Sequence, residues 1–596
     1  MQGRQAFAMH LTSLLNSLLL AAAGASAKPA ACRCRPTDSC WPKVPEWQAL
    51  NSSISGNLIA VRPIGLPCHD PTFDSAACQA VNSQTTNSTW RGTEPGAVQQ
   101  PNWEAWPVTN ESCYVDSTRS LACGQGRVPL FSAEVESAQH MQKAVKFAKK
   151  HNLRLAIKNT GHCYLGRSSA PYSLRIATHK MKSLDFVDDF VPTGCGKSKR
   201  AVKSLGPAVT IGAGVYLMDL YKAVAERNIT VVAGLAHTVG PAGGYIQGGG
   251  HSPLGAWKGM ASDNALEFKV VNSNGDLVVA NDYQNQELFW ALRGGGGGTF
   301  GVVVSVTVRT FPEVPAYVAS LAISTNNTDG FWAASRDFHA NLPKINDAGG
   351  SGYYYLTPQA EAANASTLVV ALIFANQSDE ATLRTLLTPM VTAIISHVGN
   401  DSVTFDLIFA PQTKYFFQES LAGDADTTGQ IAILGSRLVS HTFLSTTTGP
   451  AHLTQALQAV NAANPGGTVI GHIVAGGQVA RNNKIDSALN PAWRKTVVHL
   501  VVSSGWSPDA TLAEQKAARN RVTHVQVPIL KALEPDMGAY LNEADAGEEG
   551  WQASFWGSNY EKLYTLKQKL DPTGLFITTR GVGSEDWDED GLCRVR

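Results

Sequence analysis

Three glycine-rich runs within one stretch of the chain constrain its fold more than any other feature. The first is Asn159-Thr160-Gly161-His162, directly after a strand-like segment at 153–157; the others cover 240–251 and 293–301. Glycine lets the backbone approach a ligand closely, and consecutive N–H groups can form a nest for a phosphate. Because each run adjoins a strand-like segment, the three together favour a diphosphate cofactor over flexible loops.

A nicotinamide-binding fold would require Gly-x-Gly-x-x-Gly between a strand and a helix. The nearest match is Gly212-Ala213-Gly214-Val215-Tyr216-Leu217, after a strand-like segment that ends at Ile211. Leu217 stands where the third glycine would let the helix pack closely on the strand. This replacement weakens the Rossmann interpretation.

Length and composition set the size and class of the protein. The chain has 596 residues, of which 44% are hydrophobic and 16% charged. That length exceeds what one hydrophobic core normally serves, so we expect two intertwined domains. The formal net charge is zero, which argues against nucleic-acid binding because nucleic-acid-binding proteins usually carry a basic surface.

Hydrophobic periodicity predicts strands and helices on both sides of residue 312. In the first part we expect a helix within 133–150, another at 217–227, and strands at 153–157, 208–211, 229–233, 268–272, 277–280 and 302–309. In the second part we expect strands at 316–323, 352–356, 367–374, 403–409, 468–474 and 496–502, with helices at 380–398, 450–463 and, near the end of the chain, 560–570. The second pattern is typical of a sheet with helices on one face.

The N-terminus predicts secretion. Arg4 precedes an apolar run at 11–23, and Ala25-Ser26-Ala27 fits a small-residue cleavage site. Asn16 and the serines make the run short for a membrane anchor, the alternative interpretation. Eight Asn-x-Ser/Thr sequons indicate a glycoprotein; they begin at Asn51, Asn87, Asn110, Asn228, Asn326, Asn364, Asn376 and Asn400.

Cysteine usage supports the same compartment. Seven of the 10 cysteines lie between Cys32 and Cys123, and clustered cysteines in a secreted protein indicate disulfides rather than a metal site. The pairs at 68 and 78 and at 113 and 123 could close local loops, although spacing alone does not determine pairing. We expect no metal ion.

Five motifs, taken in order, resemble the vanillyl-alcohol-oxidase superfamily, whose FAD-binding domain is called PCMH-type. They are Gly161-His162, Gly212-Ala213-Gly214, Gly248-Gly249-Gly250-His251, the segment 288–296 and the C-terminal segment 559–576. The last is similar to the berberine-bridge-enzyme-like branch. Segments 249–254 and 581–586 resemble secreted fungal isoamyl-alcohol-oxidase-like members. The resemblance covers about 124–587.

The resemblance implies an α+β fold with a division of the chain into five parts. A signal peptide (1–27) and an irregular disulfide-rich lead-in (28–123) precede a PCMH-type FAD-binding domain of two α/β subdomains (124–312). A substrate domain (313–550) would carry an antiparallel sheet backed by helices. A berberine-bridge-like segment (551–596) would return to the FAD domain.

The resemblance also implies how the flavin is held. His162 would bond covalently to the flavin through a ring nitrogen, and Ala236 stands where many relatives place a second, cysteine link, so we expect monocovalent FAD. Val239 would control oxygen access to the flavin, and a residue of its small size favours an oxidase. The cofactor-binding residues would be Asn159, Thr160, Gly161, His162, Gly166, Ala236, His237, Thr238, Gly243, Gly244, Gly248, Gly249, His251, Asp263, Asn264 and Asn559.

Removing a hydride from an alcohol requires a group that takes the hydroxyl proton. In the family this base lies on the sheet of the substrate domain; the candidates are Tyr354, His472 and His499. Because strand side chains alternate between faces, either Tyr354 or the pair Tyr353 and Tyr355 faces the flavin.

The expected protein is a secreted FAD-dependent oxidase. It would transfer a hydride from a small or secondary-metabolite alcohol to the flavin, which O2 reoxidises to give H2O2. Alternatives are an oxidoreductase that closes a ring or desaturates a natural product, a sugar oxidase, a dehydrogenase with another acceptor, and a secreted binding protein without redox activity. A small-molecule substrate and O2 would be its partners, with no membrane anchor after signal cleavage and a monomer favoured.

Overall fold

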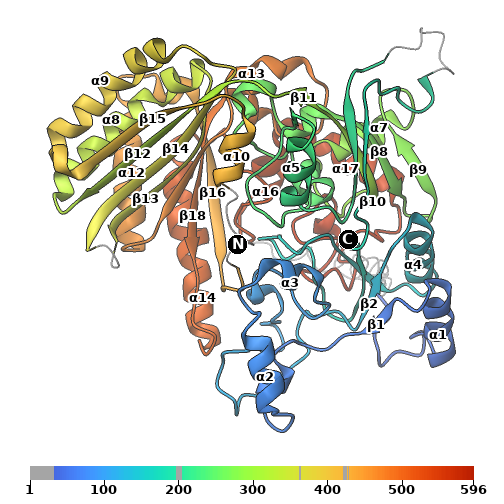
Figure 1. The fold of residues 1–596 in the computed structure, drawn as a ribbon. Helices are drawn as coiled ribbons and strands as arrows, with labels where there is room; N and C mark the ends of the chain where they lie inside the picture. The colour runs from blue at the N-terminus through green and yellow to red at the C-terminus, as the bar shows by residue number, and fades with distance from the viewer. Residues whose placement is uncertain (1–31, 196–203, 361–363, 421–425, 427) are drawn as a thin grey trace, which may run out of the picture.

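A computed structural model describes residues 32–195, 204–360, 364–420, 426 and 428–596. The predicted signal peptide lies outside these residues. The described chain forms three main sheets (Figure 1). In this part of the chain, every helix is too short or too polar to cross a membrane.

The first sheet has four strands in the order β1-β2-β4-β3. Strands β2, β4 and β3 are parallel, and β1 pairs antiparallel with β2 at the edge. Helix α4 (Ala138–Lys150) packs its apolar side, including Met141 and Val145, into the same core. The strands are β1 (Leu58–Ala60), β2 (Phe131–Glu134), β3 (Arg154–Lys158) and β4 (Ser173–Ala177).

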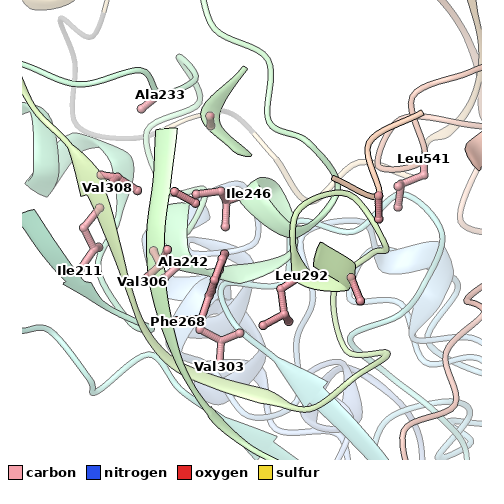
Figure 2. Close-up of a cluster of buried hydrophobic side chains, with 14 of the residues drawn as sticks. Ile211, Ala233, Ala242, Ile246, Phe268, Leu292, Val303, Val306, Val308 and Leu541 are labelled. Atoms are coloured by element: carbon pink, nitrogen blue, oxygen red, sulfur yellow. The ribbon is translucent and has the colours of Figure 1, made fainter. Parts of the chain in front are cut away.

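The second sheet is antiparallel with the order β5-β6-β10-β8-β9. Its core includes Ala242 and Ile246, which come from the second glycine run and lie beside Phe268 and Val306 of the sheet (Figure 2). These two side chains therefore anchor the glycine run to the sheet. The elements are β5 (Leu184–Val187), β6 (Ala208–Gly212), α5 (Leu217–Ala225), β8 (Ala265–Val271), β9 (Leu277–Ala280), α7 (Gln286–Leu292) and β10 (Val302–Arg309).

The third sheet has seven antiparallel strands in the order β15-β12-β14-β13-β17-β18-β16. Helices α8 (Thr328–Asp347), α9 (Glu380–Val398) and α12 (Gly449–Ala463) pack on one face of it (Figure 1). The predicted sheet with helices on one face is thus confirmed. The strands are β12 (Ala316–Thr325), β13 (Gly350–Ala360), β14 (Ala365–Ala375), β15 (Val403–Ala410), β16 (Ile433–Ser440), β17 (Val469–Ile473) and β18 (Thr496–Ser504).

The C-terminal helices α16 (Trp551–Trp556) and α17 (Tyr560–Leu570) return to the second sheet. Trp556 and Leu563 are fully buried in the core of that sheet, together with Leu292 of α7. The last residues of the chain therefore complete a core that residues 208–308 begin.

The lead-in is tied to the rest of the protein at several points. It supplies the edge strand β1 and the short helices α1 (Val44–Ser53), α2 (Ser75–Asn82) and α3 (Ser88–Thr93). The predicted local disulfides Cys68–Cys78 and Cys113–Cys123 are present, together with Cys34–Cys40. A fourth, Cys32–Cys593, links the first described residue to the C-terminal segment.

Two predictions of local structure are wrong in part. Residues 131–134 form strand β2, so the helix expected within 133–150 begins at Ala138, where Ser137 caps it. The strand expected at 229–233 is only β7 (Ile229–Thr230), which pairs with β11 (Phe311–Pro312) in a separate two-stranded sheet.

Candidate active site

The three glycine runs meet around one cavity, where segment 540–543 joins them. The lining combines glycines with polar and small apolar residues. The lining includes Asn159, Thr160, Gly161, His162, Ala236, Val239, Gly240, Ala242, Gly243, Gly244, Gln247, Gly297, Gly298, Gly301, Tyr540, Asn542 and Glu543.

Glycine is required where the runs approach one another. A Cβ atom at Gly240 would overlap the side-chain amide of Asn159, and one at Gly297 would lie 2.6 Å from Cα of Gly244. Gly161 has a φ of +84°, which side chains disfavour. The three runs can therefore form one cradle only with these residue types.

The cradle fits a flavin. Most of its wall is backbone and small side chains, so a flat ring system and a diphosphate can contact N–H groups directly. Gln247 lines the cavity, and its Oε1 atom is buried without a hydrogen-bond partner in the described chain. Such an orphaned acceptor suits a ligand that carries N–H or O–H groups.

His162 is held by a chain of hydrogen bonds that sequence reasoning did not foresee. Its Nε2 atom lies 2.7 Å from Oγ1 of Thr238, which in turn lies 3.2 Å from Oδ2 of Asp426. The same carboxylate accepts the backbone N–H groups of His237 at 2.9 Å and Thr238 at 3.1 Å. The Asp426 carboxylate thereby fixes the Thr238 hydroxyl and the loop that carries it.

This network sets the tautomer of His162. Because a carboxylate only accepts, the Thr238 hydroxyl donates to Asp426 and so accepts from Nε2–H of His162. Burial lowers the pKa of His162 to about 4, against the opposing charge of Asp426. The ring is then neutral at ordinary pH, with the lone pair on Nδ1. The position of His162 in the cavity lining makes that nitrogen available to a bound cofactor.

A second polar cluster lies behind the cavity. Tyr353, His472 and His499 face each other directly in register across β13, β17 and β18. Because opposed residues share a face, their side chains project together from the side away from the helices. Glu543 and His251 approach this row from the flavin-binding part of the chain.

The distances within this cluster are short. Nε2 of His251 lies 3.2 Å from Oε1 of Glu543, and the Tyr353 hydroxyl lies 3.2 Å from Nδ1 of His251. Nδ1 of His472 lies 3.4 Å from Oε2 of Glu543 and 3.1 Å from Nδ1 of His499. Glu543 alone of these residues also lines the glycine cradle.

Burial and charge act in opposite directions in the cluster. Burial lowers the pKa of His472 and of His499 well below the usual value, so both imidazoles are neutral. Burial alone would raise the pKa of Glu543, but the proximity of His251, which also donates a hydrogen bond to this carboxylate, outweighs burial and lowers that pKa. Glu543 is therefore an ionised carboxylate at the edge of the cavity.

Tyr354 does not belong to this cluster, which corrects its selection as a candidate base. It is fully buried on the helix-covered face of β13, where its hydroxyl lies 2.8 Å from Nε2 of His339 on α8. Strand alternation therefore directs Tyr353, not Tyr354, toward His251 and His472.

Other predicted cofactor residues have structural partners instead and do not line the described cavity. Asp263 forms an ion pair with Arg494 at 2.7 Å, and the amide of Asn264 donates to the carbonyls of Lys258 and Met260. The amide of Asn559 donates to the carbonyl of Leu489 at 2.8 Å. Their contact with the flavin stays a prediction.

Four further positions serve the cradle indirectly. Gly166 has a φ of +69° and packs against Trp103, Gly248 packs against Asn542, and Gly249 packs against Leu489. His237 contributes its backbone N–H to Asp426.

Asn542 is a cavity residue that the sequence analysis did not select. Its Nδ2 donates to the carbonyl of Gly244 at 3.0 Å, and its side chain lines the cradle. The neighbouring Glu543 was also missed, since both lie in a segment without regular periodicity. Only an extension of the C-terminal family resemblance toward the N-terminus could have indicated these two residues from the sequence.

Comparisons with known proteins agree with this geometry. Residues 129–281 match a family model described as an FAD binding domain, and residues 539–583 match one described as berberine and berberine like. An uncharacterized FAD-linked oxidoreductase of Arthroderma benhamiae is 50% identical, with 98% of this chain and all of that protein covered. The FAD-linked oxidoreductase malF of Malbranchea aurantiaca is 40% identical, with 94% of both covered.

A solved structure shares nearly the whole fold. The VAO-type flavoprotein MtVAO615 of Myceliophthora thermophila C1 superposes with a TM-score of 0.83 at 31% identity. The match covers 95% of this chain and all of that one. The cradle and the cluster behind it therefore lie in a scaffold that a known flavoprotein also has.

Proposed function

Because the chain belongs to the FAD-linked oxidoreductases of the vanillyl-alcohol-oxidase and berberine-bridge-like family, we propose that it oxidises a small or secondary-metabolite alcohol with O2 as acceptor. The glycine cradle and His162 would hold FAD, which would supply a hydride acceptor for the alcohol carbon; O2 would take up the two electrons and two protons and become H2O2. The observation that carries the proposal is an ionised carboxylate, Glu543, lining the same cavity as the glycine cradle and His162.

His162 is the proposed point of covalent attachment. With Nε2–H donated to Thr238, Nδ1 carries the lone pair that a bond to the flavin needs. Ala236 lines the cavity nearby and has no thiol, which supports a single link. Cys163 also lines the cavity, but its Sγ atom accepts the backbone N–H of Arg167 at 3.2 Å.

Glu543 is the proposed acceptor of the hydroxyl proton, with His472 behind it. His251 donates to Oε1 of Glu543 and keeps the carboxylate in place. His472 and His499 are neutral and can pass a proton onward through their 3.1 Å contact. The two histidines chosen from the sequence thus support the base rather than act alone.

Oxygen access is assigned to Val239, which lines the cavity beside Ala236. A residue of this size leaves room for O2, which supports an oxidase rather than a dehydrogenase.

The secretory route is proposed on separate grounds. Four disulfides fit an oxidising compartment, and none of the eight sequon asparagines is buried.

The reaction is tested by peroxide release from purified, flavin-loaded protein over a panel of alcohols, natural-product alcohols and sugars. Glu543→Gln should lower kcat about 10²–10⁴-fold, the usual loss of a general base, while flavin content is unchanged. Glu549→Gln, an exposed glutamate in the same segment, is the matched control. Substrate-dependent dye reduction without oxygen, combined with no peroxide in air, would contradict the oxidase assignment. Wild-type activity in Glu543→Gln would contradict its role as base.

A further inference from the structure

Three side-chain atoms of the kinds that bind metal ions converge on one point in the cluster behind the cradle. They are Nδ1 of His472, Nδ1 of His499 and Oε2 of Glu543, separated pairwise by 3.1, 3.4 and 3.6 Å. Zinc with ligands at 2.0–2.1 Å in a tetrahedron places neighbouring ligand atoms about 3.3 Å apart. The three separations lie on either side of this value.

The hydrogen bonds of the cluster are incomplete without a further group. The Oε2 atom of Glu543 is buried and accepts no hydrogen bond in the described chain. The two Nδ1 atoms face each other, so one imidazole can donate to the other but neither then donates to Oε2. A buried carboxylate oxygen without a donor is costly, and a cation at the centre would satisfy all three atoms.

The scaffold holds the three ligands in place. His472 and His499 are opposed residues of adjacent strands and are 7% and 0% exposed. His251 donates from Nε2 to Oε1 of Glu543, and the Tyr353 hydroxyl contacts Nδ1 of the same ring. His251 therefore orients Glu543, as outer-shell partners of metal ligands do.

We propose that His472, His499 and Glu543 form a binding site for a divalent transition-metal ion, for which Zn²⁺ is the best match. Two imidazoles and one carboxylate, with a water as fourth ligand, suit Zn²⁺ in a tetrahedral arrangement. The site shares Glu543 with the flavin cavity. The ion would take the lone pairs that the proposed proton transfer uses, so a metal-loaded protein would not oxidise alcohols; only this consequence rests on the proposed function.

Metal binding is tested on the full-length, flavin-loaded protein after treatment with a chelator. Titration with Zn²⁺ by calorimetry and metal analysis should give one ion per chain. Co²⁺ should give the absorption of a tetrahedral site at wavelengths beyond the flavin bands. His472→Ala and His499→Gln should each weaken Zn²⁺ binding about 100-fold or more, beyond what loss of an outer-shell partner costs.

The control is His441→Ala, which removes a partly exposed histidine paired with Asp347 and should leave Zn²⁺ binding unchanged. Flavin content and melting temperature show which variants are folded. No Zn²⁺ binding by folded wild type, or binding that survives both cluster variants, would overturn the site. Stoichiometric binding without loss of alcohol oxidation would keep the site and refute instead the role of Glu543 as base.

Discussion

At the scale of single residues, the tautomer of His162 depends on a carboxylate to which it is linked through two successive hydrogen bonds. Asp426 orients the Thr238 hydroxyl, and the oxygen of that hydroxyl accepts a hydrogen bond from Nε2–H of His162. The result is a neutral imidazole with its lone pair on Nδ1. Attachment of a flavin at Nδ1 should therefore respond to Thr238 and Asp426 even though neither is expected to form the bond.

Removing this support should slow covalent attachment. In Thr238→Val and Asp426→Asn, the tautomer of His162 is no longer fixed, and we expect the rate of flavin attachment to apoprotein to fall roughly 10²-fold. The measurement is the protein-bound flavin that survives acid precipitation at successive times after FAD addition. Thr210→Val, which breaks a threonine pair in the second sheet, is the control. Attachment at the wild-type rate in both variants would show that the network is only structural.

The sequence predicted some of these residues and could not predict others. His162 and the glycines around it follow from local spacing, because a nest of backbone N–H groups is a local structure. Asp426 is 264 positions from His162 in the sequence and is linked to it through Thr238. The sequence around Asp426 has no periodicity that indicates a role. The role of Glu543 becomes visible only in the folded protein, where its carboxylate lies beside His472 of β17 and His499 of β18.

At the scale of elements, alternation decides which side chains reach the cavity. On β13, Tyr353 faces His251 while Tyr354 enters the helix-covered core and pairs with His339. Regular strands were predicted well for this reason, and β9 and β10 match their predicted bounds. Strand β16 was missed because buried Arg437, paired with Glu548, interrupts its apolar pattern.

The buried His339 should make the substrate domain sensitive to acid. Burial lowers its pKa to about 4, against a hydrogen bond to the Ser335 carbonyl that raises it. The unfolded chain, with an ordinary histidine pKa near 6.5, binds more protons between pH 6.5 and 4. Stability is therefore full above pH 6.5 and is lost as the pH falls toward 4, by on the order of 3 kcal/mol for this group.

The measurement is the melting temperature from pH 7 to 4 for wild type and His339→Gln. Glutamine keeps a hydrogen-bonding group for Tyr354 but does not titrate, so its curve should be flatter across this window. Other histidines, such as the half-buried His179, whose pKa burial also lowers to about 4, keep some slope in both proteins. Parallel curves would refute the contribution of His339.

At the scale of the whole molecule, the two ends of the described chain meet. Cys32 bonds to Cys593, and α16 and α17 fill the core of the second sheet. This closure could not be read from cysteine spacing, because the partners lie 561 positions apart. The division at residues 124, 312 and 550 remains a prediction, and the lead-in proves less separate than expected because β1 joins the first sheet.

Loss of the closing disulfide should destabilise the protein more than loss of a local one. Replacing Cys32 and Cys593 by serine frees the longest loop, and removal of a native disulfide typically costs 2–5 kcal/mol. Replacing Cys34 and Cys40, which close a loop of six positions, should cost less. Denaturant unfolding of both double variants checks the order, and the reverse order would contradict it.

The central claim is that this protein carries a flavin bonded to His162, and acid precipitation tests it most directly. The absorbance and fluorescence of wild type and His162→Ala are recorded in the pellet and the supernatant. Yellow colour that stays with wild-type protein and leaves the variant is the predicted result. Flavin released from folded wild-type protein, or retained by His162→Ala, would contradict the account.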